Sequence, residues 1–186
     1  MFKQIIPLFL FCAALFFPSF ATAHPHAFTE AKVSFVVEDG QLKGIKEVWL
    51  FDDMFSMFMM EEFDDDRDGM LSEKEHARVE RESFGTLFDS GYFTHINVNE
   101  EFISTPKGTH FQATMQGSRM QYSFFIPLTT PAPSRVVISL FDESYYADMA
   151  MEVDDDEGLN VTLSEAPEYA YYSGMIVPVK ATLTIR

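Results

Sequence analysis

The sequence predicts an α+β fold, a mostly antiparallel β-sandwich in which a helix–loop–helix is inserted after the second strand. Three observations support this prediction. Apolar and polar residues alternate with period two from Ala27 to Val37, helical spacing begins at Asp53, and short alternating segments return after Gly91. We therefore expect one domain over residues 24–186, with the helical insert at about residues 53–90.

The first 23 residues are predicted to be a secretory signal peptide. Lys3 gives a short positive start, and the apolar run Ile5–Phe17 precedes the small residues Ala21–Ala23. This run is shorter than the roughly 20 residues that span a bilayer, so an uncleaved anchor is the less favoured alternative. We expect cleavage after Ala23, a periplasmic or secreted protein, and no stable membrane insertion after cleavage.

Two strands open the domain. Residues 27–37 place Ala31, Val33 and Phe35 on one face, and the sequence Glu-Asp-Gly at 38–40 is typical of a turn. Residues 42–51 resume the strand pattern. The two segments are therefore expected to form a hairpin.

Two helices follow the hairpin. In the first, apolar residues recur at helical spacing: Met54, Phe55, Phe58, Met59 and Phe63. The second runs from Ser72 to about Phe88, starts with a capping box formed by Ser72 and Glu75, and ends before Gly91. Four of its residues are expected to face inward: Val79, Phe84, Leu87 and Phe88.

The rest of the chain is expected to consist of short strands. Alternation or β-rich composition predicts them at residues 95–98, 101–104, 111–115, 122–126, 136–141, 161–163 and 176–185. Prolines at 127, 131 and 133 are expected to interrupt the pattern between the fourth and fifth of these.

The loop between the two helices has the sequence of an EF-hand calcium loop from Asp64 to Glu75. Such a loop takes oxygen ligands from positions one, three, five, seven, nine and twelve. These positions are Asp64, Asp66, Asp68, Met70 through its backbone carbonyl, Ser72 through a water, and Glu75 as a bidentate carboxylate. Gly69 stands where the chain must turn with positive φ. The alternative is a solvated acidic turn.

A second acidic run, Asp154–Asp156, has Glu165 at a similar spacing. Leu159 stands in place of the glycine, Gly158 in place of a ligand, and Pro167 interrupts any following helix. We interpret this run as a charged loop.

The charge of the chain limits its expected partners, and its cysteine content limits its expected disulfides. The net charge of −16 becomes −17 when Lys3 is removed, so nucleic acid is not expected as a partner. Divalent cations and basic protein surfaces are better suited, although acidity also serves solubility. Cys12 is the only cysteine and lies in the predicted signal peptide, so no disulfide is expected in the mature domain.

Cleavage after Ala23 would place His24, Pro25 and His26 at the new amino terminus. The terminal amine and the imidazole of His24 can chelate one ion, and His26 points to the same side of an extended chain. His95 or His110 could complete a nitrogen-rich site suited to Zn²⁺, Cu²⁺ or Ni²⁺. The alternative is that both terminal histidines are merely exposed.

Several motifs together resemble one bacterial family. They are His24-Pro25-His26-Ala27-Phe28, Trp49-Leu50-Phe51-Asp52-Asp53-Met54-Phe55-Ser56, the acidic loop from Asp64, Tyr92-Phe93-Thr94-His95, and Phe141-Asp142-Glu143-Ser144-Tyr145-Tyr146. The sequence is similar to the DUF1007 family across nearly the whole mature chain. Glu143 stands where the family often has proline. The resemblance implies a periplasmic component of an ABC-type transport system, linked to nickel/cobalt or zinc transport.

These observations lead to an expected function. The protein is expected to be an exported calcium-binding protein, an accessory metal-binding component that works with an inner-membrane transporter of nickel, cobalt or zinc. The alternative is a calcium-stabilised protein-interaction module with no transition-metal site. The sequence has no nucleophile motif or phosphate-binding loop, and the protein is not expected to be an enzyme. A copper enzyme using His24 is a third, less favoured hypothesis.

Overall fold

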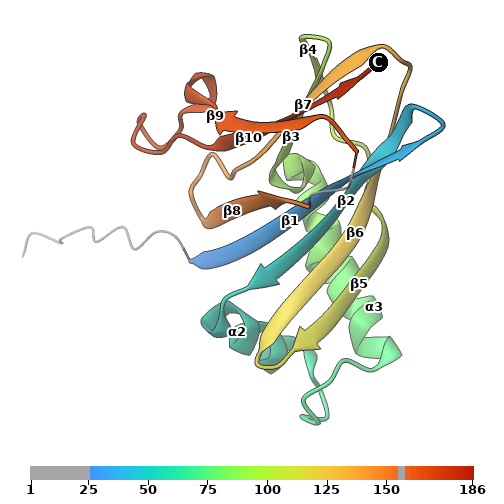
Figure 1. Cartoon of the computed structure of the whole chain (residues 1–186). Helices are drawn as coiled ribbons and strands as arrows, with labels where there is room; N and C mark the ends of the chain where they lie inside the picture. Colours follow the sequence, from blue (N-terminus) through green and yellow to red (C-terminus); the bar gives the residue numbers. More distant parts are fainter. Residues whose placement is uncertain (1–25, 155–157) are drawn as a thin grey trace, which may run out of the picture.

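Two five-stranded sheets make up most of the computed structural model, which describes residues 26–154 and 158–186 (Figure 1). The first sheet has the order β5-β6-β2-β1-β8: Thr109–Gln116, Arg119–Thr130, Gln41–Phe51, Ala27–Glu38 and Ala147–Val153. The second has the order β4-β3-β7-β10-β9: Glu101–Ile103, Thr94–Val98, Ser134–Leu140, Val179–Ile185 and Val161–Glu165. All strand pairs are antiparallel except β1 with β8. The α+β class is therefore confirmed.

Helical segments lie between β2 and β3, as expected. They are α2 (Asp53–Phe63), α3 (Glu73–Glu82) and the 3-10 segment η1 (Phe84–Phe93), and a short 3-10 turn, η2, spans Pro167–Tyr169. The predicted long second helix is thus divided at Ser83, and the chain leaves η1 through positive φ values at Gly91 and Tyr92. None of the described helices is long and apolar enough to cross a membrane.

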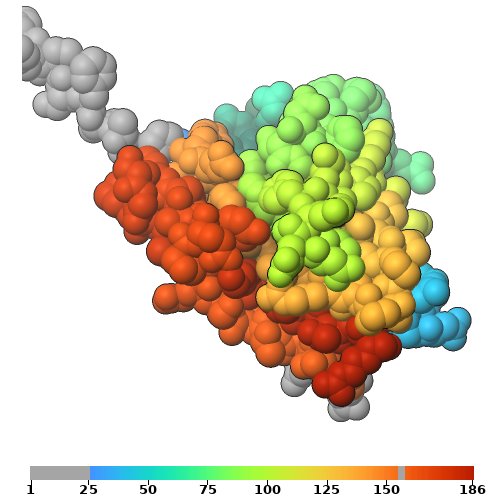
Figure 2. Space-filling view, turned by 90° about the horizontal axis from the view of Figure 1, so that it is seen from above, coloured from blue at the N-terminus to red at the C-terminus, as the bar shows by residue number. Residues whose placement is uncertain are grey.

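The two sheets and the helices share one hydrophobic core. The first sheet contributes Trp49, Tyr122 and Phe124, and the second contributes Ile96, Ile138 and Leu183. In the space-filling view (Figure 2), the yellow-green segment around β4 and the orange-red segment around β9 lie apart, in keeping with their places at the two ends of the second sheet.

The hairpin of β1 and β2 is confirmed, with Thr29 opposite Phe51 at one end and Glu38 opposite Gln41 at the other. The expectation that Pro127 breaks its strand is wrong, because β6 continues to Thr130. Pro127 pairs with Gly44 of β2, next to a shift in register. Proline is accommodated at such irregular positions, where a ladder hydrogen bond is already missing.

Strand β8 was not predicted. Ala147, Met149, Met151 and Val153 do alternate with other residues there, so the signal was present in the sequence. Alanine and methionine are weak indicators of strand structure, and β8 is stabilised mainly by its parallel pairing with β1, which is distant in sequence.

One residue that was expected to face inward in the second helical segment does not. Val79 and Phe84 are buried as predicted, but Phe88 is 41% exposed. In α2 the buried residues are Ser56, Met59 and Phe63, and Phe55 and Met60 pack against the core while partly buried. The predicted signal peptide and its cleavage site lie outside the described residues, and both stay predictions.

Candidate metal centre

Both helices that flank the acidic loop have capped N-termini. Asp52 caps α2, since its carboxylate accepts hydrogen bonds from the backbone N–H groups of Phe55 at 2.9 Å and Phe28 at 2.7 Å. Burial alone would raise the pKa of Asp52, but these N–H donors outweigh it and lower the pKa. Ser72 caps α3 with the predicted capping box to Glu75, which is confirmed.

The first three predicted ligands come together. One carboxylate oxygen from each of Asp64, Asp66 and Asp68 lies within 4.8 Å of the other two. The loop winds around Asp64, whose carboxylate accepts hydrogen bonds from the N–H groups of Asp68 at 3.2 Å and Gly69 at 2.9 Å. Gly69 adopts φ 83°, the conformation for which a glycine was expected there.

The carboxylates in this loop oppose one another electrostatically. A hydrogen bond from the Asp68 N–H favours the ionised form of Asp66, but repulsion from Asp68, some loss of hydration and repulsion from Glu75 together raise the pKa of Asp66. Bringing several negative charges together in this way is unfavourable without a cation. The three aspartates offer hard oxygen donors of the kind that Ca²⁺ and Mg²⁺ take.

The other three predicted ligands lie at the end of the loop. The Met70 N–H donates to Asp68 at 2.8 Å, and the Met70 side chain is 64% exposed. Glu75 is only 4% exposed, and its carboxylate accepts from the Asp65 N–H at 2.7 Å and from the Ser72 N–H and hydroxyl at 2.8 and 2.7 Å. The Ser72 donors above all lower the pKa of Glu75 to about 2. Glu75 thus stands beside the three-aspartate group but is not part of it.

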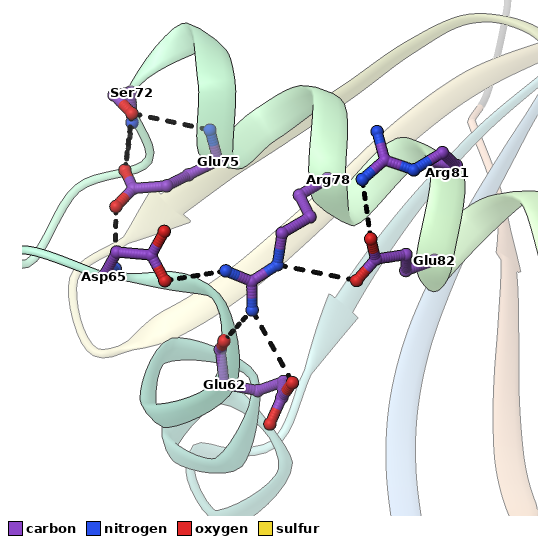
Figure 3. A network of polar contacts seen from close by, with 7 residues as sticks. All are labelled: Glu62, Asp65, Ser72, Glu75, Arg78, Arg81 and Glu82. Atoms are coloured by element: carbon purple, nitrogen blue, oxygen red, sulfur yellow. Dashed lines mark hydrogen bonds and ion pairs between the residues drawn. The ribbon is translucent and has the colours of Figure 1, made fainter.

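Arg78 joins the two helices next to the loop and was not singled out from the sequence (Figure 3). Its guanidinium contacts the Asp65 carboxylate at 2.7 Å, donates to the Glu62 carbonyl, and lies 3.5 Å from the Glu82 carboxylate. It also lies 4.9 Å from the centre of the Phe63 ring. Only the pair with Glu82, four residues on, is visible as a sequence pattern.

The described residues contain only part of the predicted nitrogen site. His24 lies outside the described residues. The His26 N–H donates to the Tyr146 carbonyl at 2.8 Å, and the two rings are 4.9 Å apart. His95 stacks on Phe141 at 3.7 Å, and burial lowers its pKa. Within residues 26–154 and 158–186, the three aspartates are the only group of three or more potential metal ligands.

Two other histidines have structural contacts. His76 follows the acidic loop, and its Nε2 accepts a hydrogen bond from the Ala113 N–H at 3.0 Å, which fastens α3 to β5. His110 Nδ1 lies 3.1 Å from the Thr109 hydroxyl.

The second acidic run does not resemble the first. Asp154 pairs with Lys32 at 3.2 Å and accepts a hydrogen bond from Ser34 at 3.0 Å. Glu165 ends strand β9, so no helix places it as a ligand. Asp155 and Asp156 lie outside the described residues.

Comparison with known proteins gives a family and no activity. A protein from Spirochaeta aurantia described as an uncharacterised 15.5 kDa protein in the trpE 3' region is 28% identical over 136 residues, 68% of this chain and 97% of that protein. An uncharacterised protein of Haemophilus influenzae is 24% identical over 132 residues, 68% of this chain and 62% of that protein. No solved structure matches the chain. The family model described as protein of unknown function (DUF1007) matches residues 9–172, and the chain therefore belongs to the DUF1007 family.

Proposed function

We propose that this protein is an exported calcium-binding protein in which α2, residues 64–75 and α3 form an EF-hand-type site. The observation that carries the proposal is the convergence of the Asp64, Asp66 and Asp68 oxygens within 4.8 Å of one another, in a loop between two helices. We further infer that the two sheets pack as a β-sandwich, because residues from both contribute to the same core.

The donor set fits calcium. Ca²⁺ takes six to eight oxygen ligands in flexible geometry, and this loop offers three aspartates, the Met70 carbonyl, a water at Ser72 and the Glu75 carboxylate. Glu75 already accepts three hydrogen bonds, two of them from Ser72 at one carboxylate oxygen. One of its about four acceptor sites is therefore free, and bidentate binding would require the Ser72 hydroxyl to turn away. A bound calcium would neutralise the repulsion that raises the pKa of Asp66.

The first prediction is that calcium stabilises the protein through Glu75. A ligand that binds only the folded state adds RT ln(1 + [Ca²⁺]/Kd), which is roughly 2.7 kcal/mol when calcium is at 100 times Kd. Thermal unfolding in millimolar calcium and in EGTA should show a higher melting temperature with calcium. Glu75→Gln should abolish most of this difference, and calorimetric titration should show the matching loss of affinity.

The matched control is Glu73→Gln. Glu73 lies in the first turn of α3, as Glu75 does, and is exposed. Its substitution by glutamine removes one negative charge, the same change as in Glu75→Gln. It should leave the calcium-dependent shift close to that of the wild-type protein. An unchanged melting curve of the wild-type protein in excess calcium would remove the proposed calcium site.

We also propose that the protein is an accessory, non-enzymatic component of periplasmic transition-metal handling, with an inner-membrane transporter of nickel, cobalt or zinc as its partner. The site would comprise the amine and imidazole of His24 together with the imidazole of His26. The hydrogen bond from the His26 N–H to the Tyr146 carbonyl supports a site at this position, because it ties the start of the described chain to the fold. The nitrogen donors suit Zn²⁺, Cu²⁺ or Ni²⁺.

The second prediction tests the terminal chelate. Adding one residue before His24 turns its amine into an amide nitrogen while leaving the fold and both imidazoles intact. Zn²⁺, Cu²⁺ or Ni²⁺ affinity, measured by titration of the processed protein, should fall at least tenfold, with calcium binding unchanged. His26→Ala should weaken the same site. Equal affinity of the extended and native termini would refute the chelate, and mass spectrometry must first show His24 as the first residue.

The second candidate function is a calcium-stabilised protein-interaction module without a transition-metal site. A specific observation favours it: the helix that leads into the acidic loop exposes large apolar side chains, with Met54, Met57 and Phe58 each more than half exposed.

A further inference from the structure

Helix α2 exposes several large apolar side chains to solvent, while a serine is among the residues that it buries. Met54, Met57 and Phe58 are 51%, 58% and 55% exposed. Their i, i+3, i+4 spacing places them on one side of the helix. Ser56, on the other side, is fully buried. An isolated exposed apolar residue needs no explanation, but three on two adjacent turns form a patch. We call Met54, Met57 and Phe58 the outer stripe of α2.

Hydrogen bonds to the neighbouring strands explain why the helix keeps this orientation. The Ser56 hydroxyl donates to the Asp52 carbonyl at 2.6 Å and accepts from the Met120 N–H at 2.8 Å. At the first turn, the Ser118 hydroxyl donates to Asp53 at 2.5 Å. The buried serine is therefore a specific anchor to β6, and the outer stripe faces solvent as a consequence of it.

The surroundings of the stripe are acidic. Glu61 lies one turn further on the same side as Met54 and Met57, is exposed, and makes no ion pair with any residue that the structure describes. The last turn of α2 contains no basic residue of its own, and the cation nearest to its carbonyl groups is Arg78 of α3, which donates to the Glu62 carbonyl. Asp53 extends the acidic border to the first turn.

We propose that the outer stripe of α2 binds a cationic amphipathic helix of a partner protein. The partner's apolar side chains would cover Met57 and Phe58, and its lysine or arginine residues would face Glu61 and Asp53. Methionine side chains are flexible and polarisable, so they adapt to the shape of the partner. Charge complementarity gives orientation and association rate more than affinity, and a stripe of three side chains fits a small, reversible interface.

Other occupants fit less well. A second copy would bring two acidic borders together, since the chain carries a net charge of −16. An anionic membrane surface would repel the same residues. A cationic amphipathic helix complements both properties of the surface, the apolar stripe and its acidic border. The proposal does not depend on calcium, and it also goes beyond the proposed transition-metal role.

The third prediction is a peptide titration. The probe is a fluorescein-labelled 18-residue helix of leucine, lysine and one tryptophan with its leucines on one face, and the readout is fluorescence anisotropy in EGTA and in calcium. Wild-type protein should bind it. The double substitution Met57→Ser, Phe58→Ser should weaken binding at least tenfold, and Glu61→Gln should weaken it less and reduce its salt dependence. The matched control is Leu163→Ser, which alters a 54% exposed apolar residue on β9 and should leave binding unchanged.

Four results would overturn the proposal. Equal binding of a scrambled peptide with no apolar face would reduce the effect to net charge. Equal loss in Leu163→Ser would mean that the stripe has no special role. Sedimentation that shows a dimer dissolved by the double substitution would assign the stripe to a second copy, and stripe-dependent co-sedimentation with phosphatidylglycerol vesicles would assign it to lipid. Failure of calcium to bind would affect the proposed EF-hand alone.

Discussion

Replacing Trp49 with alanine should lower the free energy of unfolding by about 3 to 5 kcal/mol, which is the range for truncating a large buried aromatic residue. Trp49 is 1% exposed and is one of the largest fully buried side chains in the described part of the chain. Its ring contacts Phe124 at 5.1 Å, Phe93 at 6.2 Å and Phe51 at 6.3 Å between centroids. Truncation would leave a cavity where the first sheet meets η1.

A second loss adds to the cavity. The Trp49 indole N–H donates to the Glu47 carboxylate at 2.8 Å, and both groups are buried. Trp49→Phe keeps most of the ring packing but removes this donor, so its cost should be smaller, about 1 to 3 kcal/mol. Urea unfolding of both variants separates the two effects.

The control for Trp49 is Phe102→Ala. Phe102 lies on β4 and is 63% exposed, so its truncation should change the free energy of unfolding by less than about 0.5 kcal/mol. A loss in Trp49→Ala no greater than that of Phe102→Ala would show that the packing around Trp49 contributes little to stability.

Local patterns in the sequence predicted the elements that depend on neighbouring residues. The β1–β2 hairpin has alternation on both sides of a Glu-Asp-Gly turn, and the capping box of Ser72 and Glu75 requires only a spacing of three residues. The positions of the acidic-loop residues follow from the same kind of local rule, since the Asp64 carboxylate binds N–H groups four and five residues later.

Contacts between distant residues were not predictable in the same way. Helical spacing in α2 is correct, yet the side that faces the core is determined by the bond from the Met120 N–H to Ser56, which lies 64 residues earlier in the chain. Strand β8 depends on parallel pairing with β1. The Arg78 contacts to Glu62 and Asp65 exist because the loop brings α2 and α3 together.

Glu47 is the most informative residue that the sequence analysis missed. It shares the inward side of β2 with Ile45 and Trp49, so a charged residue interrupts an otherwise apolar alternation. It is 0% exposed, accepts hydrogen bonds from Trp49 at 2.8 Å and from the Thr94 hydroxyl at 2.9 Å, and has its pKa raised by burial to about 7. The interruption was visible, but its burial and its partner 47 residues away were not.

The raised pKa of Glu47 predicts a pH dependence of stability with a definite sign. Between its usual pKa of 4.5 and its folded pKa of about 7, the folded protein binds more protons at Glu47 than the unfolded chain does. This contribution to stability is therefore fully present below pH 4.5 and is lost as pH rises through 7. At about 1.4 kcal/mol per pKa unit, the loss attributable to Glu47 is about 3 kcal/mol.

Glu47→Gln should remove this loss without breaking the local hydrogen bonds. The amide oxygen can accept from the Trp49 indole, and the amide NH₂ can donate to the Thr94 oxygen. Thr94 can then direct its own proton to the Tyr92 carbonyl, which lies 3.0 Å away. The variant should be close to wild type at pH 5 and more stable by up to about 3 kcal/mol at pH 8. Glu47→Ala, in contrast, should be destabilised at both pH values, because it leaves a cavity and an unpaired indole donor.

The measurement is urea unfolding at pH 5 and pH 8 with EGTA present, so that metal binding does not contribute. Other titrating groups are common to both proteins, and the difference between wild type and Glu47→Gln isolates Glu47. Parallel pH profiles of the two proteins would mean that Glu47 ionises in the folded core as readily as in the unfolded chain. If the two profiles diverge, and Glu47→Gln is the more stable protein above pH 7, the buried Glu47 carboxylate lowers the stability of the wild-type fold at that pH.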